Sequence, residues 1–501
     1  MATPGASRRV PTGIEGLDAI LRGGLPRGEV FLVQGTPGTG KTLLSIQFLR
    51  AGVENGESCL FISLSQSAEG LRRNVGGAGL SLEGIRVHDD LPVEAPGSVE
   101  QEQVIFHDEH VEFDETVRAL TEAVERAEPD RVVFDGIGYL RLLVRSAAQY
   151  RRQLLALRRF FSSRDITVML TDDQSVVPGE DVLQSLVYGA LLLEQTRTNY
   201  GDTRRELHIV KLRGTDHASG THEFRISTGG LKVFPRLRSH HVSSSEQNEA
   251  LTSGIESLDN LLGGGLQEGT SCLILGPVGT GKTSLATLYA DAAARRNHSS
   301  AVFLFDERPE IFVRRSEALG MPITQHVEEG RVSLHAVMSG EITPGEFAYS
   351  VSREVRERDV RVVIIDTLTG YLSAMPDQRH LITKIQDLLT YLSRQGVLTI
   401  LVVAQHGVIG EQSQHQNQLR GPIDISYLAD AILTTQHFEI DGALRRAVSV
   451  YKKRYGAHER RIRELFIEDG LIKVGAPMTE AVGTLLGHSL EAGTDASDDD
   501  T

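Results

Sequence analysis

The chain has 501 residues, of which 40% are hydrophobic and 24% charged, and its formal net charge is −15. This length predicts two or more domains that each bury a core, and the composition is ordinary for a globular protein. An acidic surface repels a nucleic-acid backbone unless basic residues are concentrated in one place. The best such cluster is RRQLLALRRF at 151–160. Its spacing favours the solvated face of a helix over a nucleic-acid site.

Two observations favour a cytoplasmic protein. The sequence has no apolar run that could span a bilayer, and its opening residues, MATPGASRRVPTG, lack the apolar core of a secretion signal. The chain has only two cysteines, Cys59 and Cys272, both beside apolar strand-like runs. One disulfide across two domains is not expected in a reducing compartment, so we predict two small core residues.

An internal repeat organises the chain. Thr12 begins the stretch TGIEGLDAILRGGLPRGEVFLVQGTPGTGKTLL, and Ser253 begins the stretch SGIESLDNLLGGGLQEGTSCLILGPVGTGKTSL. Every residue of the second stretch lies 241 positions after its counterpart, with no gap. A chance motif would not carry its flanks with it, so the chain is a tandem duplication.

Each half alternates apolar strands with helical stretches. The first half has the strands VFLVQG, CLFISL, RVVFD and TVMLT, and the second half has matching ones. This alternation predicts an α/β fold with a mainly parallel sheet flanked by helices in each half. The later segments RELHIVKLRG and RAVSVYKKRYG are typical of hairpin strands that extend the sheet. We predict domains at 1–237 and 251–477, a linker at 238–250 and a disordered acidic tail at 478–501.

Both repeats carry the Walker A pattern G-x-x-x-x-G-K-[ST], a phosphate-binding loop between a strand and a helix. The glycines let successive backbone N–H groups face phosphate oxygens, and the helix N-terminus adds positive charge. The pattern predicts ATP bound with Mg²⁺, the lysine reaching the β- and γ-phosphates. The predicted nucleotide-binding residues are Gly35, Thr36, Gly38, Thr39, Gly40, Lys41 and Thr42 in the first loop and Gly276, Gly279, Thr280, Gly281, Lys282 and Thr283 in the second.

Asp135 and Asp366 each end an apolar strand that follows the loop at the position of a Walker B aspartate. Such a carboxylate can hold Mg²⁺ through its water shell, and the hydroxyl that ends the loop can bind the ion directly. We therefore predict Thr42 with Asp135, and Thr283 with Asp366, as the metal-binding residues. The alternative for each aspartate is an ordinary strand-ending turn.

The repeats differ after their second strand. The second half reads FDERPE, which places Asp306 and Glu307 where a carboxylate can orient or deprotonate a water or hydroxyl. At the same offset the first half has Ser65 and Gln66, neither of which is a base at neutral pH. Gln66 could still position a water. The prediction is that the first half binds ATP and hydrolyses it slowly or not at all, and that Glu307 is the base of the second half.

Late in each half a lysine is followed two positions later by an arginine: Lys211 and Arg213, then Lys452 and Arg454. On a strand, residues i and i+2 share a face. Such a pair could clamp a γ-phosphate, including that of a nucleotide held by a neighbouring subunit, or it could be an ordinary solvated strand edge. The pattern alone leaves both interpretations open.

Together the TGIEGLD lead-in, the paired loops, the acidic pair and the KLRG segment resemble the KaiC family of RecA-like ATPases over nearly the whole chain. The resemblance implies two tandem RecA-like P-loop domains in a hexameric double ring with ATP at subunit interfaces. Lys211, Arg213, Lys452 and Arg454 would then reach the neighbour's nucleotide.

In the same resemblance, Asp306 and Glu307 match the family's catalytic pair. The family's second lobe phosphorylates itself, and here Ser426 takes the serine place and Tyr427 the threonine place. Ser426 is thus a possible phosphoacceptor. The first lobe of the family is its main ATPase, so Ser65 and Gln66 are a substantial departure. The tail shows no match to the family's partner-binding segment, so a full circadian oscillator is not implied.

Three functions remain open from the sequence. The first is a KaiC-like signalling ATPase with possible serine/threonine autokinase activity in the second domain and protein signalling partners. The second is a recombinase- or helicase-type motor, which would need basic and aromatic DNA-binding loops. The loop GEQSQHQNQLRG at 410–421 is polar and nearly uncharged instead. The third is a nucleotide-gated oligomeric scaffold.

Overall fold

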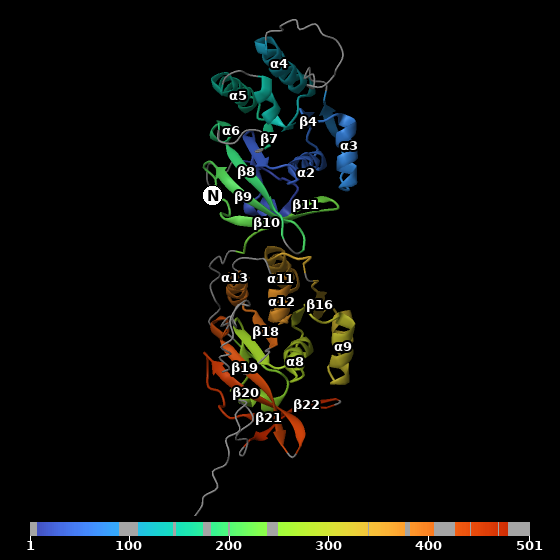
Figure 1. Cartoon of the computed structure of the whole chain (residues 1–501), viewed down its shortest axis with the longest axis vertical. Helices are drawn as coiled ribbons and strands as arrows, with labels where there is room; N and C mark the ends of the chain where they lie inside the picture. The colour runs from blue at the N-terminus through green and yellow to red at the C-terminus, as the bar shows by residue number, and fades with distance from the viewer. Residues whose placement is uncertain are drawn as a thin grey trace, which may run out of the picture. The chain divides into compact units, whose positions relative to one another are not determined.

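The structure is a computed structural model that describes residues 8–89, 109–143, 147–173, 182–198, 201–237, 249–338, 340–375, 381–404, 426–440, 442–468 and 470–478. The chain forms two compact units, Met1–Arg236 and Leu237–Thr501 (Figure 1). Nearly all of the predicted linker and tail lies outside the described residues, as does the loop at 410–421. None of the helices in the described ranges combines the length and apolar character that crossing a bilayer requires.

The first unit is built on a nine-stranded sheet in the order β11-β10-β9-β8-β3-β7-β6-β4-β5. The strands from β8 to β5 in this order are parallel, and β9, β10 and β11 extend the sheet antiparallel, as the sequence predicts. The elements are β1 Arg9–Val10, α1 Glu15–Ile20, β2 Leu25–Pro26, β3 Val30–Gly35, α2 Lys41–Glu54, β4 Cys59–Ser63, α3 Ala68–Gly77, β5 Ile85–His88, α4 Glu109–Ala127, β6 Arg131–Asp135, η1 Ile137–Leu143, α5 Ala147–Ser162, β7 Thr167–Asp173, α6 Val182–Leu186, β8 Gly189–Thr196, β9 Arg204–Leu212, β10 Thr221–Ser227 and β11 Gly230–Phe234.

The second unit repeats this plan with the sheet order β16-β15-β17-β18-β14-β19-β20-β21-β22. The strands from β16 to β19 are parallel and the last three are antiparallel. The elements are β12 Ala250–Leu251, α7 Glu256–Leu261, β13 Leu266–Gln267, β14 Ser271–Gly276, α8 Lys282–Arg295, β15 Ser299–Leu304, α9 Pro309–Ala318, α10 Ile323–Glu328, β16 Val332–Ala336, α11 Pro344–Arg358, β17 Val360–Asp366, α12 Leu368–Ala374, α13 Leu381–Arg394, β18 Leu398–Ala404, η2 Ser426–Leu428, β19 Ala431–Ile440, β20 Ala443–Lys453, β21 Arg463–Glu468 and β22 Leu471–Pro477.

The central strands are apolar at almost every position because both faces of each sheet are covered. On one face of the first sheet, Phe31 and Val33 share a core cluster with Leu44 and Phe48 of α2. On the other face, Leu32 belongs to a second cluster that includes side chains of α4 and α5. The predicted α/β class, with a mainly parallel sheet flanked by helices in each half, is confirmed.

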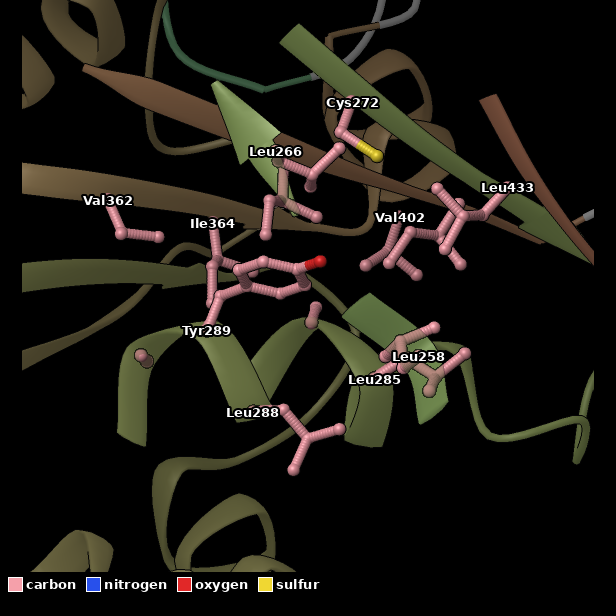
Figure 2. Close-up of a cluster of buried hydrophobic side chains, with 14 of the residues drawn as sticks. Leu258, Leu266, Cys272, Leu285, Leu288, Tyr289, Val362, Ile364, Val402 and Leu433 are labelled. Atoms are coloured by element: carbon pink, nitrogen blue, oxygen red, sulfur yellow. The ribbon is translucent and has the colours of Figure 1, made fainter. Parts of the chain in front are cut away.

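The same face of the second sheet packs on α8 (Figure 2). Tyr289 lies in the middle of this core, with Ile364 and Val402 in the same cluster, and is only 2% exposed. Cys272 belongs to this cluster, and Cys59 is buried in the corresponding cluster of the first unit. Both are free thiols, so the prediction of two small core residues is confirmed.

The arginine-rich stretch at 151–160 lies on α5. Arg151, Arg152 and Arg159 are exposed, whereas Leu154 and Leu157 are buried against the sheet. This distribution is that of an amphipathic helix with a solvated basic face, as predicted.

The repeated TGIEGLD lead-in has a local structural cause. The carboxylate of Asp18 accepts hydrogen bonds from the backbone N–H and the hydroxyl of Thr12, at 2.7 and 2.8 Å. In the second unit Asp259 accepts the backbone N–H of Ser253 at 2.7 Å. The motif therefore ties the segment before α1 or α7 to that helix, ahead of the strand that carries the loop.

Gly16 allows α1 to pack against β11. A Cβ atom at this position would lie 1.8 Å from the carbonyl oxygen of Val233. The second unit has Ser257 at the same place, and its hydroxyl accepts the backbone N–H of Val474 at 3.3 Å. We expect Gly16→Ala to destabilise the first unit by about 1–3 kcal/mol through overpacking. Ser257→Ala should cost about 1 kcal/mol through a lost hydrogen bond.

Hydrogen exchange measured by mass spectrometry reports on the two units separately. It therefore checks the expected loss of stability in the unit that each variant changes. No loss of protection in the first unit of Gly16→Ala protein would contradict the close approach at Gly16.

Candidate functional site

Each phosphate-binding loop runs from the end of a central strand to the start of a helix that packs under the sheet. Gly40 and Gly281 precede the helices with φ of 96° and 89°, in the left-handed region that favours glycine. A Cβ on Gly281 would come within 2.0 Å of the Ile467 side chain. Because the first N–H groups of a helix have no intrahelical acceptor, this geometry presents a row of donors to an anion.

The two loop lysines fold back onto their own loops. The Nζ of Lys41 donates to the carbonyls of Gly35 and Thr36 at 2.7 and 3.0 Å, and that of Lys282 donates to Pro277 at 2.6 Å. Burial lowers the pKa of both lysines, and nearby carboxylates oppose that shift. An anion within the loop would take the place of these carbonyl contacts and stabilise the charged lysine.

The predicted metal-binding pairs meet in both units. The hydroxyl of Thr42 donates to Asp135 at 3.1 Å, and that of Thr283 bonds to Asp366. Each aspartate is only 5% exposed. Burial raises the pKa of both carboxyls, and raises that of Asp366 to about 6. A buried carboxylate beside a loop hydroxyl is a donor set suited to Mg²⁺ and its waters.

The second unit adds two charged groups and their partners beside this aspartate. Asp306 accepts the hydroxyl of Thr367 at 2.6 Å. Glu307 forms an ion pair with Arg315 on α9 at 2.7 Å. The negative charges of Glu307 and Asp306 contribute to the raised pKa of Asp366. The acidic pair predicted from FDERPE is thus placed next to the proposed metal position.

The first unit has neutral groups at all these places. Gln66 donates to Asp135 at 3.5 Å, and Asn74 donates to the side-chain oxygen of Gln66 at 3.1 Å. Asn74 lies 241 positions before Arg315. The first unit therefore has an amide pair where the second unit has an ion pair. Ser65 is exposed at the position of Asp306.

A cleft of about 690 Å³ opens over the loop of the second unit. It is lined by Lys282, Thr283, Asp306 and Arg315 together with Arg446 of β20. One terminal nitrogen of Arg315 is buried there with no hydrogen-bond partner in the described structure. An unpaired guanidinium N–H in a residue that lines the same cleft as the loop fits an anionic ligand such as a nucleotide phosphate.

Arg446 is a site residue that sequence reasoning missed. Its Nε donates to the carbonyl of Gly279 in the loop at 3.0 Å. Its counterpart at the same offset is Arg205 of β9, whose Nε is buried without a partner among the described residues. The 241-residue offset aligns the two arginines, but only the strand pairing shows that they lie beside the loops.

The later lysine–arginine pairs lie away from their own loops. Lys211 donates to the carbonyl of Gln184 at 2.5 Å, and Arg213 donates to Ser185 at 2.8 Å, at the end of α6. Lys452 donates to Ser426 and Ala429 at 3.0 and 2.9 Å. Both side chains of the first pair thus face one helix end, as residues two apart on one strand face would.

The pairing register of the strands sets how far the lysine–arginine pairs lie from the phosphate-binding loops. Leu212 pairs with Gly189, and Gly189 pairs with Phe31 at the start of β3, whereas the loop follows Gly35 at its end. In the second unit Lys453 pairs with Ala431, which pairs with Cys272 near the start of β14. Four strand residues span about 13 Å. The basic pairs therefore lie at the opposite edge of the sheet from their own loops.

Ser426, the possible phosphoacceptor, begins the short 3₁₀ helix η2, and its carbonyl accepts the Nζ of Lys452 at 3.0 Å. Arg454 pairs with Asp430 at 3.1 Å next to it. Tyr427 is 47% exposed. The serine and the basic pair of the second unit thus form one cluster at the sheet edge remote from the loop.

Two glycine loops of this geometry on two successive parallel sheets define a tandem P-loop protein with RecA-like units. The family model described as "ATPase: KaiC" matches the chain twice, over residues 10–238 and 251–479. The chain belongs to the KaiC ATPase family, as its sequence resemblance implied.

Several relatives match nearly end to end. The chain is 26% identical over 490 residues to the circadian clock protein KaiC3 of Synechocystis, covering 96% of this chain and 94% of that one. It is 27% identical over 477 residues to the circadian clock oscillator protein KaiC of Prochlorococcus marinus, covering 92% and 91%. The match to KaiC of Picosynechococcus is 26% over 479 residues, covering 92% and 89%.

Burial of a charged aspartate lowers the folding stability of the nucleotide-free protein, and stability measurements can detect this effect. Because the folded pKa of Asp366 is raised to about 6 from 3.8, its protonated form stabilises the nucleotide-free second unit at low pH. That stability is lost as the pH rises through about 6. Asp366→Asn removes this titration, so the variant should be more stable near pH 7.5 by up to about 3 kcal/mol.

Differential scanning calorimetry of nucleotide- and magnesium-free protein between about pH 4 and pH 8 checks this expectation. A variant no more stable than the original chain near pH 7.5, or one that keeps its pH dependence, would contradict the burial argument.

Proposed function

We propose that this protein binds ATP with Mg²⁺ in both units and hydrolyses it mainly in the second, as a KaiC-like regulatory or signalling ATPase. The main support for this proposal is that the two repeats have different side-chain pairs at the same two positions. Glu307 and Arg315 form a charged pair beside Asp366, whereas Gln66 and Asn74 form a neutral pair beside Asp135. The first unit therefore keeps a binding loop and lacks the carboxylate of the second.

The second unit offers a role for each of its site residues. The backbone N–H groups of the loop and Lys282 would hold the phosphates. Thr283 and Asp366 would hold Mg²⁺, which neutralises phosphate charge when bound. Glu307 would accept the proton of the attacking water, and its ion pair with Arg315 at 2.7 Å orients the carboxylate. Asp306, fixed by Thr367, would orient the same water.

We propose that Lys211, Arg213, Lys452 and Arg454 act on the nucleotide of a neighbouring subunit in a ring, which family likeness makes a hexamer. The support is their position: each pair lies about 13 Å along the sheet from its own loop. A basic pair that cannot reach the phosphates bound by its own unit can either bind the nucleotide of a second copy of the chain or remain a solvated strand edge. This arrangement favours an oligomer with nucleotides at subunit interfaces.

Autophosphorylation at Ser426 is the accompanying proposal. The carbonyl of Ser426 accepts the Nζ of Lys452 at 3.0 Å. If Lys452 reaches a neighbour's γ-phosphate, Ser426 comes close to the same phosphate. This adjacency favours a serine/threonine autokinase in trans over a plain surface serine.

The two alternative functions have less support. A recombinase- or helicase-type motor needs basic or aromatic loops, and the loop at 410–421 lies outside the described residues. A nucleotide-gated scaffold would use the same binding loops without turnover, and the neutral first unit suits that role. The circadian role named for the relatives is theirs, and we do not extend it to this chain.

Incubation with γ-labelled ATP and Mg²⁺ tests both activities at once. Glu307→Gln should lower phosphate release about 100-fold or more, because the proton acceptor is lost while the loop is kept. Ser426→Ala should remove label from the protein, located by mass spectrometry, while phosphate release continues.

The matched control is Glu310→Gln, an exposed first-turn glutamate of α9 that, unlike Glu307, is not among the charges that raise the pKa of Asp366. If Glu307→Gln behaves like this control, the proposed place of the chemistry is wrong. If label persists in Ser426→Ala, the proposed phosphoacceptor is wrong.

A further inference from the structure

The strand beside the first loop ends in two acidic residues. Asp172 and Asp173 close β7, and in the parallel register Asp173 pairs with Gly35, where the loop begins. In the second unit Ala404 pairs with Gly276 at the equivalent point of β18. The two units therefore carry acidic residues at different places beside the loop. In the second unit they follow β15, and in the first unit they end β7.

Asp172 and Asp173 point to opposite faces, because side chains alternate along a strand. Asp172 accepts the Gln34 amide at 3.0 Å, on the face away from α2. Asp173 shares a face with Thr171, whose hydroxyl donates to Asp135 at 2.7 Å. Asp173 is therefore on the side of the sheet where the loop, α2 and the proposed metal position lie.

The charge around Lys41 places Asp173 near the phosphate end of the site. Among the carboxylates that stabilise the Lys41 ammonium, Asp173 has the largest effect, ahead of Asp135. In the second unit, Asp366 is the carboxylate that stabilises the Lys282 ammonium. In a P-loop the lysine reaches the β- and γ-phosphates, so a carboxylate beside it is close to the bond that hydrolysis breaks.

We propose that Asp173 is the water-activating carboxylate of the first unit, taking the role that Ser65 and Gln66 cannot fill. In the reaction the water oxygen forms a bond to the γ-phosphorus, and the bond from that phosphorus to the bridging oxygen breaks. The proton lost by the water passes to Asp173, and the products are ADP and phosphate. This step rests on the proposed ATP binding by the first unit and adds a base to it.

This position predicts slow rather than absent turnover in the first unit. Asp173 stabilises the Lys41 ammonium, so it would serve the lysine as well as the water. Gln66 remains beside Asp135 and can position the water without deprotonating it.

The test isolates the first unit within the full chain. Lys282→Ala empties the second loop, and equilibrium dialysis with labelled ATP then counts the nucleotide that remains bound. Single-turnover conversion of ATP to ADP is measured in this background and with Asp173→Asn, Asp173→Glu and Asp172→Asn added. Asp172→Asn is the matched control, because it changes the neighbouring acid on the other face.

We expect one ATP bound per chain and slow conversion in the background protein. Asp173→Asn should slow conversion at least tenfold and leave ATP affinity unchanged or tighter, because a negative charge beside the phosphates is removed. Asp173→Glu should restore part of the rate, and Asp172→Asn should leave it unchanged.

Three results would overturn the inference. Conversion could be the same with Asp173→Asn as without it. Affinity could fall in step with rate, which would make Asp173 only a counter-ion of Lys41. Bound ATP could remain unconverted in the background. If Lys282→Ala protein binds no ATP although Lys41→Ala protein does, the proposed nucleotide binding by the first unit has failed as well.

Discussion

The register of the parallel strands around β3 and β14 decides where the phosphate-binding loops, the buried aspartates and the basic pairs lie. Because parallel strands end at one edge of a sheet, the loop, the buried aspartate and the acidic groups meet there. The same register carries the basic pairs of β9 and β20 to the other edge, through pairings such as Leu212 with Gly189. A shift of one residue would turn each side chain to the opposite face.

The two units use this shared frame to hold different amounts of charge. Around Asp366 the second unit gathers Asp306, Glu307 and Arg315, and the accumulated negative charge contributes to the raised pKa of Asp366. Around Asp135 the first unit places hydroxyl and amide hydrogen-bond donors, together with the charge of Lys41. At the positions of Glu307 and Arg315 in the second unit, the first unit has Gln66 and Asn74, so each unit keeps a matched pair there.

Much of this could be predicted from the sequence because the signals are local. Apolar runs bounded by glycine and aspartate predicted the parallel strands, and the duplicated loops predicted the position of both sites. The offset between the repeats exposed Ser65 and Gln66 as a departure. The cysteines and the basic face of α5 also followed from local pattern.

The remainder depends on contacts between segments far apart in the chain. Asn74 and Arg315 align at the repeat offset, but their partners are set by how α3 and α9 pack. Arg446 and Arg205 become neighbours of the loops only through hairpin pairing. Asp173 looks like an ordinary strand end until its register with Gly35 is known. Side-chain direction at a strand end is a property of the sheet, and a single sequence does not contain it.

We propose that the duplicated loops serve one working unit and one mainly binding unit. Steady-state phosphate release by Lys41→Ala protein and Lys282→Ala protein, each checked for one bound nucleotide per chain, tests this division. We expect Lys41→Ala to keep most of the activity of the unchanged chain and Lys282→Ala to lose most of it. The reverse order, or equal losses, would contradict it.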